Sequence, residues 1–184
     1  EALDLWKKKA EKSMFDYGFH MCIVERTDDT TNQLDAMLAE GITSFKLFTD
    51  YPGVFQIDDG SIFRALRWAR AKGALVQVHA VNGAATTPII EEAAAAGRLE
   101  PVDHGLCRPS RLEGEATSRV IDLAEVADAP IYIVHLTCKE ALDAVRNARH
   151  RGVKAFAETC PQYLYLSHDD MARLGCCFGD IVET

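Results

Sequence analysis

The sequence has no apolar segment long enough to cross a membrane. No run approaches the ~20 consecutive apolar residues that a spanning helix needs. The first residues also lack the basic stretch followed by an apolar stretch that marks an export signal. We therefore expect a cytoplasmic protein without a membrane partner.

Extended clusters of lysine and arginine are absent as well, and the one run of three consecutive Lys or Arg residues is Lys7–Lys9. The 184 residues include 20 Lys and Arg against 28 Asp and Glu, which gives a net charge of -8. Nucleic acids and anionic lipids attract basic patches, so this balance argues against either as the main partner. A small molecule is the partner we expect.

Cysteine pairs with metal or redox spacing are missing too. The six cysteines form no CxxC motif and follow no regular spacing. Disulfide frameworks and zinc knots depend on such spacing, so we interpret the cysteines as reduced thiols. The adjacent Cys176 and Cys177 receive no role.

Short apolar segments alternate with amphipathic ones along the chain. We predict strands at 16–24, 41–51, 74–79, 130–135 and 153–157. We predict helices at about 30–40, 60–73 (after an Asp58-Asp59 cap), 87–96, 114–127 and 138–150, with a polar excursion over 101–109. This alternation is typical of βα units that build a parallel sheet.

No glycine-rich phosphate turn follows the first predicted strand. The motifs GxGxxG and GxxxxGK[ST] occur nowhere, although a doubly wound sheet usually carries such a turn. Five units are also too few to close a barrel of eight strands. We therefore predict an α/β fold, a contiguous segment of a (β/α)8 TIM-like barrel, with residues 1–184 as one partial domain. Glu1–Trp6 reads as the middle of a helix, without a preceding cap.

One lysine lies in the middle of an apolar strand. Lys46 is flanked by Phe45, Leu47 and Phe48. An unpaired buried ammonium costs several kcal/mol, roughly, so this side chain must lose its charge or find a partner. Lys46 is thus the first candidate for a chemical role.

Two further predicted strands end on a histidine, His79 and His135. In a (β/α) barrel the active site lies at the carboxyl ends of the strands, so both side chains are expected there with Lys46. Neutral imidazoles suit zinc, and three protein ligands with an open position describe a catalytic metal site.

Several motifs, in order, resemble the hydantoinase/dihydropyrimidinase branch of the amidohydrolase superfamily. The resemblance extends from about residue 14 to 173, and the spacings of 33 (79 minus 46) and 56 (135 minus 79) are also similar. The motifs are Ser44–Phe48 with Tyr51, Val76–Ala80 with Asn82 and Gly83, Arg108 and Pro109 with Glu113–Thr117, Tyr132–His135 with Cys138–Ala141, and Glu158–Leu164.

The resemblance implies a zinc-dependent cyclic amidohydrolase. The family lysine is carboxylated to a carbamate that bridges two zinc ions, and Lys46 occupies that position. His79 and His135 correspond to the two histidines that hold the second metal. A metal-bound hydroxide then attacks the cyclic amide of a hydantoin or dihydropyrimidine.

The same resemblance assigns three aromatic residues. Tyr51 corresponds to the phenol that stabilises the tetrahedral oxyanion. Phe48 and Phe55 correspond to positions at the mouth of the substrate pocket. The complete protein is expected to form a homodimer or homotetramer.

Parts of the family pattern have no counterpart in this chain. The paired histidines of the first strand and the aspartate base of the eighth strand are missing, so we expect the chain to be inactive by itself. Val81 and Ala84 stand where relatives usually have acidic residues, and Cys107 stands where a serine is common. The sequence after about residue 174 no longer follows the family.

Two alternatives remain open. One is an allantoinase-type hydrolase of cyclic ureides, which also uses a strand-borne lysine. The other is a non-catalytic scaffold like the collapsin-response-mediator proteins. Those relatives replace the lysine and the last histidine, so Lys46 and His135 favour the enzyme, and Tyr51 favours hydantoinase over allantoinase.

Overall fold

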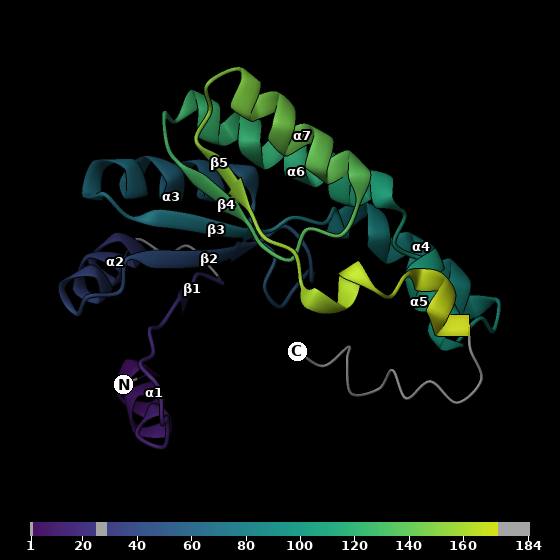
Figure 1. Cartoon of the computed structure of the whole chain (residues 1–184), viewed down its shortest axis with the longest axis horizontal. Coiled ribbons are helices and arrows are strands. Elements are labelled where there is room, and N and C mark those ends of the chain that lie inside the picture. Colours follow the sequence, from purple (N-terminus) through teal and green to yellow (C-terminus); the bar gives the residue numbers. More distant parts are fainter. Residues whose placement is uncertain (1, 25–28, 173–184) are drawn as a thin grey trace.

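Five parallel strands form one sheet in the computed structural model, which describes residues 2–24 and 29–172 (Figure 1). The sheet order follows the sequence, β1-β2-β3-β4-β5, and every neighbouring pair is parallel. The predicted α/β barrel segment is therefore confirmed, because sequential parallel strands build the wall of a (β/α) barrel. The strands are β1 (Met21–Cys22), β2 (Ser44–Phe48), β3 (Leu75–His79), β4 (Ile131–Ile133) and β5 (Ala155–Ala157).

Helices connect these strands. None of the helices in the described part of the chain is both long and apolar enough to span a membrane. The α-helices are α1 (Ala2–Ala10), α2 (Thr30–Ala39), α3 (Asp59–Lys72), α4 (Gly83–Ala95), α5 (Pro101–Leu106), α6 (Ser110–Val126) and α7 (Lys139–His150). Two short 3-10 helices, η1 (Pro161–Leu164) and η2 (His168–Ala172), follow β5.

The core lies between the sheet and the helices α3, α6 and α7 (Figure 1). Phe45 and Leu47 of β2 are fully buried on this side, and the Phe45 ring meets Trp68 of α3 edge to face, with centroids 4.9 Å apart. Successive strand residues point to opposite faces, so Lys46 and Phe48 lie on the other face of the sheet. That face holds the candidate site.

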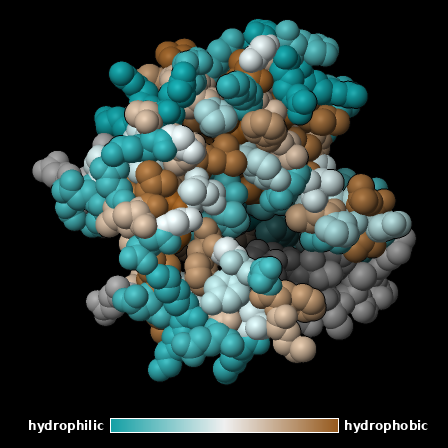
Figure 2. Space-filling view, turned by 60° about the vertical axis from the view of Figure 1, so that its left-hand side comes forward, coloured by the Kyte–Doolittle hydropathy of each residue, from teal (hydrophilic) through white to brown (hydrophobic). Residues whose placement is uncertain are grey.

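The described surface mixes polar and apolar side chains. On the side in view in Figure 2, hydrophobic residues form small separated areas among hydrophilic ones.

All four described cysteines are free thiols, as predicted, and Cys176 and Cys177 lie outside the described residues.

Helix α4 begins four residues earlier than predicted. The structure caps the helix with Asn82, whose side chain accepts a hydrogen bond from the Ala85 amide at 3.1 Å. Asparagine is strongly preferred at this cap position, so the helix starts at Gly83 and Pro88 falls inside it.

The predicted polar excursion over 101–109 is wrong in part, because α5 occupies most of it. Pro101 stands at the start of this helix, and Asp103 accepts a hydrogen bond from the Glu100 amide at 3.0 Å. Gly105 allows close packing, since a Cβ there would stand 3.0 Å from the Cβ of His168 in η2. A long-range contact thus packs α5 against η2.

All five strands are shorter than predicted. Strand β1 covers only Met21–Cys22 of the expected 16–24, and β4 ends at Ile133. His135 therefore lies two residues beyond its strand. Its backbone φ of 38° explains the early end, because a left-handed residue cannot continue a strand.

Candidate active site

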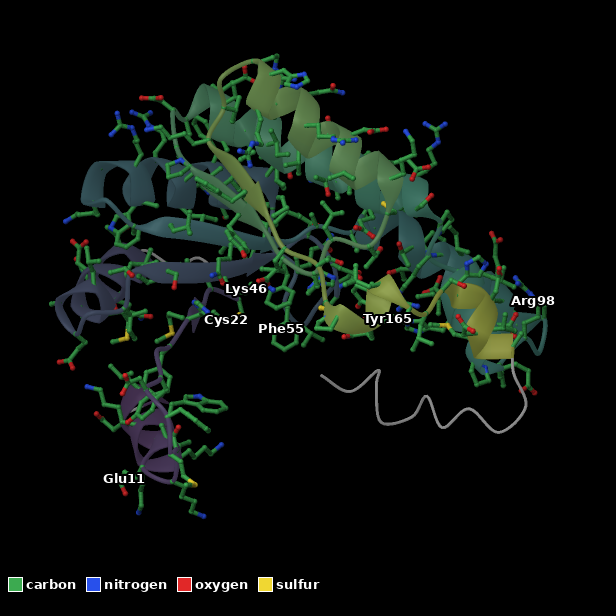
Figure 3. All side chains as sticks on the ribbon, in the orientation of Figure 1. Glu11, Cys22, Lys46, Phe55, Arg98 and Tyr165 are labelled. Atoms are coloured by element: carbon green, nitrogen blue, oxygen red, sulfur yellow. The ribbon has the colours of Figure 1, made fainter. Side chains whose placement is uncertain are left out.

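Neighbouring strands bring the candidate side chains to one end of the sheet. Phe48 of β2 pairs in register with His79 of β3, and Lys46 pairs with Gln77. Figure 3 shows Lys46, Cys22 and Phe55 on the side of the sheet away from α6 and α7. This is the barrel-interior side, at the carboxyl ends where barrel enzymes carry out their chemistry.

The two predicted histidines are in direct contact. His79 Nδ1 lies 2.9 Å from His135 Nε2, and the ring centroids are 4.7 Å apart. Burial, followed by the nearby His79 and Lys46, lowers the pKa of His135 to about 4. His135 is therefore neutral near pH 7, and a neutral imidazole is the form that binds a metal ion.

The backbone of His135 is in a conformation that residues other than glycine rarely adopt. Its φ of 38° places it at the edge of the left-handed region, and Tyr51 has a φ of 62°. Such residues cost of order 1–3 kcal/mol and cluster at functional sites. Both of these unusual residues lie beside His79.

Lys46 is half-buried, and its Nζ lies 5.0 Å from the centroid of the Phe48 ring. Burial lowers the pKa of Lys46, while Cys22 and Glu158 act in the opposite direction. Within residues 2–24 and 29–172, no carboxylate forms an ion pair with this ammonium. A lysine with a lowered pKa has a larger fraction of free amine, the nucleophilic form.

Aromatic rings surround the His79 imidazole. Phe48 stacks on Phe55 with centroids 5.1 Å apart, and Tyr51 lies 5.3 Å from His79. Tyr51 is 43% exposed, so solvent reaches part of this residue. Burial and the nearby Asp50 raise the pKa of Tyr51, which keeps its phenol protonated and able to donate a hydrogen bond.

One residue of the site escaped the sequence analysis. Asp50 is only 6% exposed, and its Oδ2 lies 3.8 Å from His79 Nε2. Burial alone would raise the pKa of Asp50, but His79, the Tyr51 amide and Arg108 outweigh it and lower that pKa. The alternation of Lys46, Phe48 and Asp50 on one face was the signal that could have identified it.

The residues present fit part of a metal centre. Two nitrogens bound to one tetrahedral zinc at about 2.0–2.1 Å stand roughly 3.3 Å apart, close to the observed 2.9 Å between His79 and His135. The buried Nε2 of His79 has no hydrogen-bond partner in the described part of the chain. The described residues hold no group of three His, Cys, Asp or Glu side chains around this pair. A further anionic ligand would have to come from Lys46 after carboxylation of its amine, or from outside the described residues.

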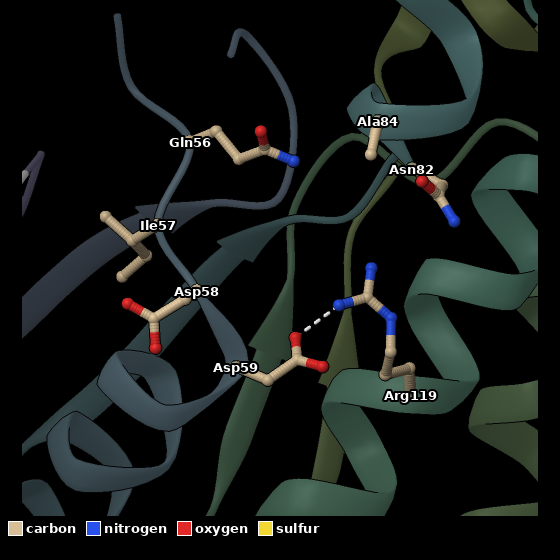
Figure 4. Close-up of a pocket in the computed structure, with 7 residues that line it drawn as sticks. All are labelled: Gln56, Ile57, Asp58, Asp59, Asn82, Ala84 and Arg119. Carbon is tan, nitrogen blue, oxygen red and sulfur yellow. Dashed lines mark hydrogen bonds and ion pairs between the residues drawn. The ribbon is translucent and has the colours of Figure 1, made fainter. Parts of the chain in front are cut away.

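A separate groove of about 490 Å³ lies between the start of α3, the β3–α4 turn and α6 (Figure 4). Its charged groups already have partners within the chain. Arg119 forms an ion pair with Asp59 and donates from Nε to Glu115 at 2.9 Å. The groove has no imidazole or lysine in its lining, so the candidate site remains the His79–His135 pair.

Comparisons with known proteins point to one family, although no family model matches the chain. The chain is 47% identical over 174 residues to a D-hydantoinase of Streptomyces coelicolor, covering 94% of this chain and 37% of that protein. A D-hydantoinase of Geobacillus stearothermophilus is 45% identical over 175 residues, again with 37% of its length covered.

Solved structures agree with these relatives. A D-hydantoinase structure superimposes with a TM-score of 0.91 at 45% identity, over 94% of this chain and 38% of that chain. A dihydropyrimidinase of Brevibacillus agri gives a TM-score of 0.92 at 40% identity, over 95% of this chain and 38% of that chain. The chain thus spans less than two fifths of the length of these relatives.

Proposed function

Because this chain is a partial member of the hydantoinase family, we propose that the complete protein hydrolyses the cyclic amide bond of hydantoins or dihydropyrimidines. The contact between His79 and His135, at the carboxyl ends of the strands and on the same face as Lys46, is the observation that carries this proposal. It brings two imidazole nitrogens together, one of them on the neutral His135, beside a lysine of lowered pKa.

In the complete protein, a carboxylated Lys46 together with His79 and His135 would hold the two proposed zinc ions. Zinc in such a site acts as a Lewis acid and activates water for attack on a carbonyl carbon. The chain's own contribution is the free amine of Lys46, which adds to CO2 and releases a proton to give a carbamate anion. This reaction removes the buried positive charge and creates an oxygen ligand.

Three aromatic residues handle the substrate in this proposal. The protonated Tyr51 hydroxyl donates a hydrogen bond to the oxygen on which negative charge develops as the amide is attacked. Phe48 and Phe55 stack on one another and present apolar surface to the exocyclic group of the ring. The substrate is thus a small cyclic ureide or imide.

The complete protein is proposed to act in the cytoplasm as a homodimer or homotetramer. The test is an assay of the complete purified protein with hydantoin, dihydrouracil and allantoin, together with zinc analysis. We expect turnover of hydantoin or dihydrouracil, with about two zinc ions per chain, as the paired-metal mechanism requires. Turnover of allantoin alone would favour an allantoinase, and a zinc-free, inactive protein would favour a scaffold.

A further inference from the structure

Asp50 lies directly behind the His79 imidazole, on the side away from His135. The two side chains are 9% and 12% exposed, and the atoms Asp50 Oδ2 and His79 Nε2 are 3.8 Å apart. This separation exceeds a hydrogen bond. Within the described residues, however, Nε2 has no other partner.

Backbone contacts hold Asp50 in this position. Its Oδ1 accepts a hydrogen bond from the Tyr51 amide at 2.7 Å. A Cβ at Gly83 would stand 2.4 Å from the same oxygen and 2.7 Å from the Asp50 Cα, so the carboxylate fills space that only a glycine leaves open. Thr49 fastens the neighbouring backbone, because its hydroxyl donates to the Val81 carbonyl at 2.7 Å.

The position of Asp50 determines which nitrogen of His79 carries the proton. A neutral imidazole has one N–H donor and one lone pair. A buried carboxylate facing a ring lone pair would leave two acceptors unsatisfied, which is costly, so the proton belongs on Nε2. The lone pair then lies on Nδ1, which points at His135.

We propose that Asp50 is a positioning residue that holds His79 as the Nε2–H tautomer and directs the Nδ1 lone pair to the metal position beside His135. Carboxylates behind metal-binding histidines act in this way in many zinc sites. The inference rests on the proposed zinc site. It adds a residue to which neither the motifs nor the proposed reaction gives a role.

The first test uses histidine-selective 15N labelling of the complete, metal-free protein. The resonances of His79 are expected to show the proton on Nε2 in the wild type. In Asp50→Asn, the Tyr51 amide still occupies the side-chain oxygen, so the new NH2 group faces His79 and donates to Nε2. We expect the proton to move to Nδ1 in this variant, where it blocks the metal-binding lone pair.

The second test measures zinc affinity by competition with a colorimetric chelator. We expect Asp50→Asn to lower the affinity by about 10- to 100-fold, the usual effect of losing such a carboxylate. Asp122→Asn is the matched control, since it removes the same charge from a 63% exposed side chain on α6 and should leave the affinity unchanged.

The inference is overturned if His79 of the wild-type protein carries its proton on Nδ1, a result that needs no variant to fold. It is also overturned if Asp50→Asn keeps the Nε2–H tautomer and a zinc affinity within about twofold of Asp122→Asn. A wild-type protein that binds no zinc, yet shows the Nε2–H tautomer, overturns the proposed function while supporting the Asp50–His79 interaction.

Discussion

At the scale of single residues, the cost of burying a charge determines what Lys46 can do. Its pKa is lowered by burial, and no ion pair among the described residues compensates the ammonium. Replacement by arginine keeps a cation, but the guanidinium stays protonated and cannot add to CO2.

If the proposed zinc centre is right, Lys46→Arg in the complete protein loses at least one of the two proposed zinc ions. We expect its kcat to fall by about 10² or more, the scale of losing an electrostatic contact to the transition state. Zinc analysis and steady-state kinetics measure both effects. A zinc content and a kcat equal to those of the wild type would contradict carboxylation of Lys46.

Tyr51 offers a second test at this scale, because its raised pKa keeps the hydroxyl protonated and able to donate a hydrogen bond. Tyr51→Phe keeps the ring contacts with Phe55 and His79 but removes the donor. We expect kcat to fall by about 10² with zinc content unchanged, the scale of losing one oxyanion donor. Unchanged turnover at a normal zinc content would reduce the role of Tyr51 to packing.

The candidate site was readable from the sequence where chemistry and strand position coincide. Lys46 in an apolar strand and the strand-end histidine His79 are conspicuous for that reason. The alternation of Lys46, Phe48 and Asp50 places Asp50 on the same face. Its contact with Gly83 in the β3–α4 turn could not be predicted, because contacts between distant segments leave no local pattern.

At the scale of elements, hydrophobic alternation and caps predicted the strands and most helices. The βα order and helix α3 were recoverable, because Asp58 caps its start and Gly73, with a φ of 71°, ends it. Helix α5 was not, since its six residues carry no amphipathic period and it is held by packing against η2. Long-range packing thus decides the short elements.

The contact between α6 and α7 gives a prediction about elements. A Cβ at Gly114 of α6 would stand 2.5 Å from the Cβ of Glu140 on α7 and 3.3 Å from its backbone carbonyl carbon. We expect Gly114→Ala to force the helices apart and to destabilise the protein by about 1–3 kcal/mol, the usual cost of overpacking.

Thermal unfolding of the complete protein at a fixed scan rate measures this effect. Gly18→Ala is the control, because no atom lies within 4 Å of a Cβ at Gly18. Equal unfolding temperatures for the two variants would show that α6 and α7 adjust to the added methyl group without cost.

At the scale of the whole molecule, the described sheet is open at both sides. Strand β1 pairs only with β2, and β5 pairs only with β4, so each outer edge in the described chain presents unpaired backbone groups. Figure 1 also shows α1 apart from the sheet, and the ion pair of Lys7 with Glu40 at 2.7 Å ties it to the end of α2. Open parallel edges promote association between chains.

The isolated 184-residue chain is therefore expected to associate as its concentration rises and to lack measurable hydrolysis of hydantoin or dihydrouracil. Its described residues provide the imidazoles of His79 and His135 but no third His, Cys, Asp or Glu to complete a group. Two imidazoles hold zinc weakly, so we expect at most about one zinc ion per chain, whereas a catalytic zinc site takes three protein ligands.

Sedimentation velocity over a concentration series, zinc analysis and the hydrolysis assay measure these properties, with the complete protein as the control. A monomeric isolated chain that hydrolyses hydantoin near the rate of the complete protein, loses this activity to a chelator and regains it with zinc would contradict the expectation, because the described residues would then form a whole catalytic centre by themselves.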